Sequence, residues 1–137
     1  MKTYTFIFVI VFAGLFSCNS KSEKKPTTAL DTGRAFIDAS LKGDFENAQT
    51  LLLKDTENIQ LFEAFKLYYQ KMPADQKLHY KTASYQINKY LDLNDSTTII
   101  NYSNDYMNKP MEIKVVRKNN TWNIDFAYTY SGNLPIQ

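Results

Sequence analysis

The hydrophobic pattern of the chain changes from a helical to a strand-like period at Pro73, and this change limits the folds open to it. Before Pro73, apolar residues recur at steps of three and four, as they do along one face of a helix. After Pro73, apolar and polar residues alternate, as in antiparallel strands with one buried face. Helices followed by strands, without alternation between the two, predict an α+β fold.

Three helices are predicted before Pro73. The first is capped by Thr27 or Thr28 and ends at Gly43, since glycine readily adopts the left-handed conformation found at helix ends. Asp44 caps a second, short helix, and a third covers residues 56–72. The residues that share a stripe are Leu30, Gly33, Ile37 and Leu41 in the first helix, Phe45, Ala48, Leu51 and Leu52 in the second, and Ile59, Phe62, Phe65 or Lys66, and Tyr69 in the third.

Four strands are predicted after Pro73, over residues 78–93, 97–104, 111–115 and 121–126. Turns are expected at Asn94-Asp95 and at Asn119-Asn120, and the chain from Tyr128 onward is expected to fray. The inward positions of the last three strands are Thr98, Ile100, Tyr102, Met111, Ile113, Val115, Trp122, Ile124 and Phe126. We expect Trp122 to be buried against the first helix, near Ile37.

These elements have one economical arrangement. The N-terminal helices pack in the concave face of a curved antiparallel sheet of about four strands, which gives a cone-shaped α+β domain. Residues 28–130 provide enough chain for one domain with one core. The single cysteine, Cys18, excludes an internal disulfide and a cysteine-based metal site.

The N-terminus has the pattern of an export signal. Lys2 precedes an apolar run of eleven residues, 6–16, which is too short for a membrane-spanning helix, and the small Ser17 follows it. Leu15-Phe16-Ser17-Cys18 resembles the lipobox of bacterial lipoproteins, which implies removal of residues 1–17 and acylation of Cys18 with diacylglycerol and a further fatty acid such as palmitate. Residues 18–27 are then a flexible tether, and 131–137 a tail.

The composition beyond the signal limits the partners. The mature chain has 15 basic and all 14 acidic residues, so a strongly basic nucleic-acid surface is not expected. Among the seven residues after Cys18 only Glu23 is acidic, whereas Bacteroidota lipoproteins sent to the cell surface carry an acidic run there. The expected location is therefore the outer membrane, facing the periplasm.

Two further segments resemble a known fold. Residues 35–48, with the helix stop Gly43-Asp44, look like the opening helices of the nuclear transport factor two-like fold, which ketosteroid isomerase-like and SnoaL-like proteins share. Residues 115–126, with Asn119-Asn120 and Trp122, look like its final hairpin. The resemblance covers about residues 28–130 and extends to small Bacteroidota-type lipoproteins of unknown function with this layout. It implies the cone fold and leaves the activity open.

Few residues of the chain are candidates for acid–base catalysis or for binding a ligand. Asp125 is expected to face water, because Trp122, Ile124 and Phe126 take the inner face, and His79 is expected to be a surface histidine at a strand start. If the side chain of Asp38 or Glu63 pointed into the cone, that residue could act as a buried acid. No catalytic residue, cofactor or metal is predicted. The residues that either line a pocket or belong to the core are Tyr68, Tyr69, Tyr85, Tyr102 and Trp122.

Two functions remain open at this stage. The first is a lipid-anchored, non-enzymatic binding or scaffold module with a protein partner. The alternative is a cone-fold enzyme or a carrier of a small apolar ligand. The two differ in whether polar groups converge inside a hollow cone or apolar side chains fill it.

Overall fold

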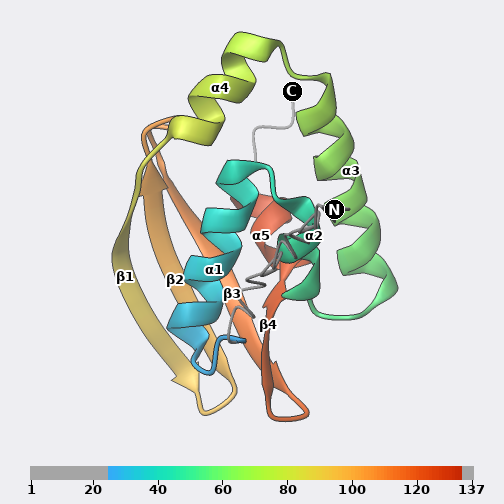
Figure 1. The fold of residues 1–137 in the computed structure, drawn as a ribbon. Coiled ribbons are helices and arrows are strands. Elements are labelled where there is room, and N and C mark those ends of the chain that lie inside the picture. The colour runs from blue at the N-terminus through green and yellow to red at the C-terminus, as the bar shows by residue number, and fades with distance from the viewer. Residues whose placement is uncertain (1–24, 134–137) are drawn as a thin grey trace, which may run out of the picture.

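The structure, a computed structural model that describes residues 25–133, has five helices and four strands in that range (Figure 1). The helices are α1 (Ala29–Lys42), α2 (Phe45–Thr50), α3 (Thr56–Lys71), α4 (Ala74–Thr82) and α5 (Phe126–Asn133). The strands are β1 (Tyr85–Asn94), β2 (Thr97–Asn104), β3 (Pro110–Lys118) and β4 (Thr121–Asp125). Figure 1 shows α1 lying across the concave face of the sheet, with α4 bridging α3 and β1 at one end. The predicted α+β class is confirmed.

The first three helices begin where the sequence predicts, but the second ends at Thr50, so Leu51 and Leu52 of its predicted stripe lie just beyond it. The Thr28 hydroxyl accepts a hydrogen bond from the Asp31 N–H at 3.0 Å, and Gly43 ends α1 in the left-handed conformation with φ 73°. Asp44 and Asp55 cap α2 and α3 in the same way, each accepting from a backbone N–H three residues ahead. The helix boundaries are therefore set by short-range hydrogen bonds that the sequence makes visible.

The sheet is an antiparallel meander with strand order β1-β2-β3-β4. Asn119 and Asn120 form the predicted β3–β4 turn with φ of 52° and 59°, the conformation that suits a tight hairpin. In the register, Ile100 pairs with Ile113 and Val115 with Ile124, so these side chains share the face that the helices cover. The chain between α2 and α3 closes the β4 edge, because the Leu53 N–H donates to the Ile124 carbonyl at 2.9 Å.

The predicted first strand is wrong over its first part. Residues 78–82 belong to helix α4, and β1 begins only at Tyr85. Pro73 at the N-cap and Asp75 in the first turn are helix-start signals. The alternation of Leu78 and Tyr80 suggested a strand, but only Tyr80 is buried, and one buried residue in a short helix satisfies the same pattern.

The predicted C-terminal end is also wrong. The last strand ends at Asp125 and not at Phe126, and helix α5 runs from Phe126 through the residues after Tyr128 that are expected to fray. The Asp125 carboxylate accepts from the Tyr128 N–H at 3.2 Å and so caps this helix. Residues 134–137 of the expected tail, with residues 1–24 and hence Cys18, lie outside the described residues.

The core lies between the helices and the concave face of the sheet. Phe62 and Phe126 meet edge to face with ring centroids 5.2 Å apart, and Phe36 and Phe65 pack around them. The buried apolar residues of the main cluster all fall between Ala29 and Phe126, so this part of the chain contains a core of its own. Trp122 is only half-buried near the hairpin end, which corrects the expectation of full burial near Ile37.

Candidate functional site

The inner face of the sheet, where the cone fold would hold a ligand, is covered by packed apolar side chains. Ile100, Ile113, Val115 and Ile124 point to this face and are fully buried. The helices supply the opposing surface, with the rings of Phe36 and Phe126 at a centroid distance of 6.0 Å. Side chains that pack this closely hold one another in place and leave the inner face no open cleft.

Helix α1 approaches the sheet closely at Gly33. A Cβ atom built on Gly33 would overlap Cδ1 of Ile100 and lie 3.9 Å from Cγ2 of Val115. Glycine at this position therefore allows the helix backbone to lie against β2 and β3. This close contact accounts for the place of Gly33 in the apolar stripe of the first helix.

A group of tyrosines fills the end of the cone beneath α4. Tyr80 is buried, and its ring lies 5.6 Å from Tyr69 and 5.0 Å from Tyr106. Tyr68 and Tyr102 are close enough to interact electrostatically with Tyr80. Burial raises the pKa of Tyr80 and of Tyr102 above the usual range of a tyrosine. We call these five residues, Tyr68, Tyr69, Tyr80, Tyr102 and Tyr106, the tyrosine cluster.

The structure thus brings together three of the five residues expected at a pocket or in the core. Tyr68, Tyr69 and Tyr102 belong to the tyrosine cluster, where Tyr69 packs on Phe45 at 4.9 Å and Tyr68 is largely exposed. The other two lie elsewhere. The Tyr85 hydroxyl donates to the Asp38 carboxylate at 3.4 Å, and Trp122 lies 5.9 Å from the Arg117 guanidinium.

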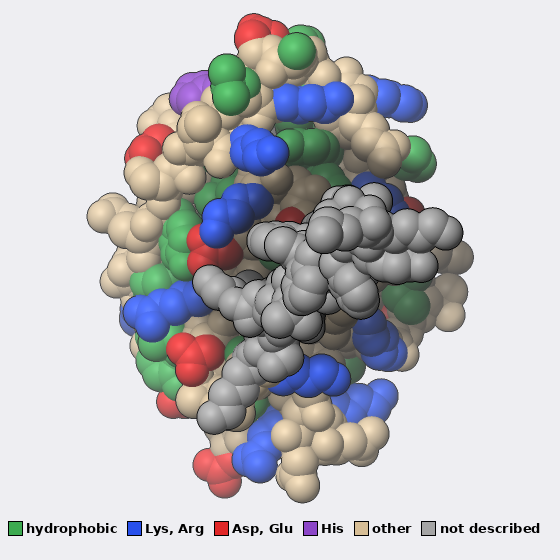
Figure 2. Space-filling model, in the orientation of Figure 1, with side chains coloured by type: hydrophobic (Ala, Val, Ile, Leu, Met, Phe, Trp, Pro, Cys, Tyr) green, Lys and Arg blue, Asp and Glu red, His purple; other side chains and the backbone are tan. Residues whose placement is uncertain are grey.

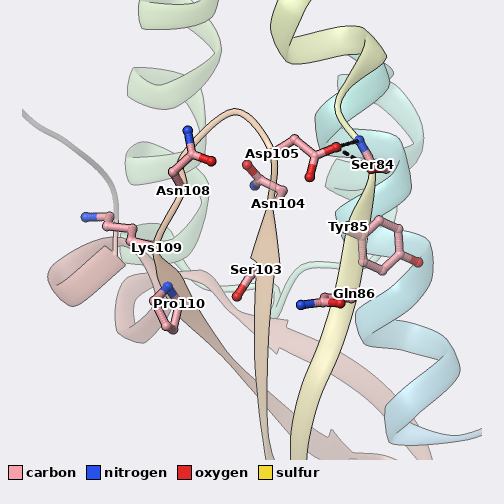
Figure 3. A pocket seen from close by; sticks show the side chains of 9 residues that line it. All are labelled: Ser84, Tyr85, Gln86, Ser103, Asn104, Asp105, Asn108, Lys109 and Pro110. Atoms are coloured by element: carbon pink, nitrogen blue, oxygen red, sulfur yellow. Dashed lines mark hydrogen bonds between the residues drawn. The ribbon is translucent and has the colours of Figure 1, made fainter.

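A polar groove lies where β1 begins and β2 ends (Figure 3). Its volume is about 350 Å³. Its lining residues come from β1, β2 and the loop that leads into β3, and they are Ser84, Tyr85, Gln86, Ser103, Asn104, Asp105, Asn108, Lys109 and Pro110. We call this feature the strand-end groove.

The strand-end groove carries hydrogen-bonding groups, several of which are bonded to the protein itself. The Asp105 carboxylate accepts from the Ser84 hydroxyl and from the Ser84 N–H, the latter at 3.3 Å, and this fixes the loop to the start of β1. The Asn104 side chain accepts from the Met107 N–H at 2.8 Å. Lys109 is the one cation in the lining. The groove can bind a polar group by hydrogen bonds, but its lining does not pair an acid with a histidine for proton transfer.

Sequence reasoning identified only Tyr85 among the groove residues, and it missed Tyr80 and Tyr106 in the tyrosine cluster. Tyr80 was assigned to a strand, so its contact with α3 was not expected. The loop over residues 104–110 was predicted, but its position beside Ser84 follows from the register of β1 with β2, in which Tyr85 pairs with Asn104. The predicted turn at Asn94-Asp95 does not fix that register by itself, because the pairing shifts between Ile87 and Lys89 and between Asp92 and Asn94.

The acids and the histidine considered for proton transfer lie at the surface or bond to neighbours. Asp125 forms an ion pair with Lys114 at 3.0 Å besides capping α5, and His79 is exposed on α4 beside the Tyr106 ring. Asp38 lies near Lys42 at 3.8 Å, and Glu63 pairs with Lys66 at 3.2 Å. These four side chains therefore have structural surroundings rather than the buried pairing of an acid–base catalyst.

Within residues 25–133, no group of three or more histidine, cysteine, aspartate or glutamate side chains is placed to hold a metal ion. In the same part of the chain, no helix has the length and apolar character needed to cross a membrane.

Comparisons with known proteins add no relative. No family model matches the chain, no curated protein matches it in sequence, and no solved structure matches it. The resemblance to the nuclear transport factor two-like fold, and to lipoproteins that share it, therefore stays a prediction from the sequence.

Proposed function

We propose that this chain is a lipid-anchored protein of the bacterial cell envelope whose domain acts as a binding or scaffold module and not as an enzyme. The proposal that the domain is a binding or scaffold module rests on one observation, the filled interior. Ile100, Ile113 and Ile124 take the inward positions that a ligand would contact, and each is fully buried. Binding then falls to the outer surface, where the strand-end groove is one concave polar feature.

The anchor is proposed from the sequence alone. Export would remove residues 1–17, and the thiol of Cys18 would carry diacylglycerol, with a further acyl chain on its new amino group. Two or more acyl chains hold a protein stably on a bilayer, whereas one does not. The domain would then be held at the periplasmic face of the outer membrane by the short segment before α1.

The alternative is a carrier of a small apolar ligand or an enzyme inside the cone. Either one needs space between α1 and the sheet, and the contact of Gly33 with Ile100 argues against such space. An enzyme would also need a buried acid or base there. Asp38, an acid on α1, is about half exposed to solvent.

Cell fractionation tests the anchor. The full chain and its Cys18→Ser variant are expressed in a Gram-negative bacterium that is fed an alkyne analogue of palmitate, with Ser20→Ala as the matched control. We expect label and membrane retention for the parent and the control, and no label for Cys18→Ser. An unlabelled parent would refute the anchor.

An apolar probe tests the filled interior. The side-chain methyl groups of Ile100 and Ile113 are followed by NMR while dodecanoate is added to residues 19–137, whose core is complete. We expect both signals to stay unchanged at concentrations below micelle formation. A saturable shift of both signals would support the carrier instead.

A further inference from the structure

We propose that the end of the domain formed by the last turns of α3 and by α4 lies against anionic phospholipid headgroups. We call the surface of residues 66–82 the basic end. The proposal rests on the lipid anchor proposed above, because the anchor is what keeps the domain beside a bilayer. It goes further by naming the face that meets the membrane and the lipid chemistry that this face recognises.

Charge is unevenly distributed over the domain. Residues 66–82 contain Lys66, Lys71, Lys77 and Lys81 against a single acid, Asp75. The remainder of residues 29–133 has eight basic and twelve acidic residues, so the basic end has the opposite sign from the rest. A local excess of lysines attracts anionic headgroups within about a Debye length of the surface, which is about 10 Å at moderate salt.

Two of the four lysines of the basic end are exposed, and a third, Lys77, is half-buried. Lys71 and Lys81 are exposed, and Lys77 reaches the Gln70 carbonyl at 2.7 Å while it lies over the Tyr69 ring. Among the described residues, none of these three lysines forms an ion pair, whereas Lys66 is paired with Glu63 at 3.2 Å. Three positive charges are therefore not neutralised by the domain itself.

Exposed apolar side chains stand among these lysines. Leu78 on α4 is 63% exposed, Leu67 on α3 is 53% exposed, and Tyr68 is 45% exposed. Leu78 is the most exposed large hydrophobic residue in the described part of the chain. Figure 2 shows blue and green side chains at the end of the molecule near the purple His79, where Figure 1 places α4. Lysines around an exposed leucine and tyrosine suit the boundary between headgroups and acyl chains.

The length of chain before α1 permits this contact. Ten residues, 19–28, separate Cys18 from the start of α1, and they span at most about 35 Å when fully extended. Helix α1 has 14 residues and is about 21 Å long, and α4 lies near its far end in Figure 1. The segment is therefore long enough for an anchored Cys18 and the basic end to meet the same bilayer.

Vesicle sedimentation tests the proposal with residues 19–137, whose core lies entirely between Ala29 and Phe126. This chain carries no lipid, so any binding comes from its own side chains, and the tether lysines Lys21, Lys24 and Lys25 are the same in every variant. Vesicles of phosphatidylcholine alone are compared with vesicles containing about one-third phosphatidylglycerol. The variant Lys71→Gln/Lys77→Gln/Lys81→Gln is matched by Lys54→Gln/Lys89→Gln/Lys118→Gln, which removes the same charge elsewhere. Thermal unfolding confirms that both variants are folded.

We expect binding only to the anionic vesicles. Because each lysine near the surface contributes about fivefold, the basic-end variant, which lacks three, should bind roughly tenfold to hundredfold more weakly. The matched variant should change by less than about threefold, and Leu78→Gln should weaken binding without any change of charge. Equal losses in the two triple variants, or equal binding to neutral vesicles, would overturn the proposal. Either result leaves the acylation of Cys18 to be judged by the labelling experiment, so the two failures are distinguishable.

Discussion

Replacing Asn58 by alanine should destabilise the domain more than any other change to a helix cap in this chain. Asn58 is buried near the start of α3, where its side-chain amide donates to the Asp55 carboxylate at 2.9 and 3.0 Å. Its carbonyl oxygen accepts from the N–H groups of Phe126 and Ala127, the latter at 3.0 Å. One side chain therefore fixes the start of α3 and the start of α5.

The chain provides a matched control for this variant. Asn47 has the same relation to Asp44, with its amide donating at 2.6 Å, but it is exposed and reaches no second helix. Asn47→Ala should cost about 0.5–1 kcal/mol, the value of a surface hydrogen bond. Asn58→Ala leaves two backbone N–H groups at the α5 terminus without their acceptor, and each buried, unsatisfied group costs about 1–3 kcal/mol.

We therefore expect a total loss of about 3 kcal/mol for Asn58→Ala in urea unfolding of residues 19–137. A loss of that size should lower the melting temperature by roughly 12–24 °C in a domain of about this length. If Asn58→Ala and Asn47→Ala lose the same free energy of unfolding within about 0.5 kcal/mol, the bridge between α3 and α5 contributes nothing and the reasoning fails.

Three other predictions concern packing and pH. Gly33→Ala should destabilise the domain by about 1–2 kcal/mol because the new Cβ meets Cδ1 of Ile100, and it should be neutral or stabilising in an Ile100→Val background; equal effects in both backgrounds would contradict the contact. The N–H of Asn58 lowers the pKa of Asp55, so the stability that ionised Asp55 provides should be present at neutral pH and lost as the pH falls below about 4. Urea unfolding at pH 7 and at pH 2.5 gives the free energy of unfolding of the parent and of Asp55→Asn. The difference between the two proteins should be smaller at pH 2.5, and an equal difference at both pH values would contradict this role of Asp55. Burial raises the pKa of Tyr80 and Tyr102, so the free energy of unfolding should fall as the pH rises above about 10, where the unfolded tyrosines ionise. Tyr80→Phe should reduce that loss in alkaline unfolding curves. The same pH dependence in the parent and in Tyr80→Phe would show that Tyr80 is not its cause.

Much of the fold follows from short-range signals that the sequence displays. Thr28, Asp44 and Asp55 cap helices through contacts three residues away, and Gly43 and Asn119-Asn120 mark a helix end and a hairpin. Such contacts depend only on neighbours in the chain, so residue type and spacing are enough to predict them.

The elements that were mispredicted depend on contacts between distant parts of the chain. Helix α4 is held by the packing of Tyr80 on Tyr69 and Tyr106, and α5 by Asn58, far from it in sequence. The alternation of apolar and polar residues around Leu78 does not indicate contacts with these distant residues.

The candidate site was still harder to predict for the same reason. The strand-end groove exists because the register of β1 with β2 sets Ser84 beside Asp105. Two shifts in the β1–β2 pairing give this register, and the predicted turn does not reveal them. The sequence predicts that the inner face of the sheet is apolar. Whether space remains between that face and α1 depends on how closely α1 approaches β2 at Gly33.

The most direct test of the central claim is the mass of the mature protein extracted from bacterial membranes. The account predicts a chain that begins at Cys18, lacks residues 1–17, and carries the added mass of diacylglycerol and a third acyl chain on that residue. A chain that keeps residues 1–17, or one cut elsewhere with Cys18 as a free thiol, would contradict it.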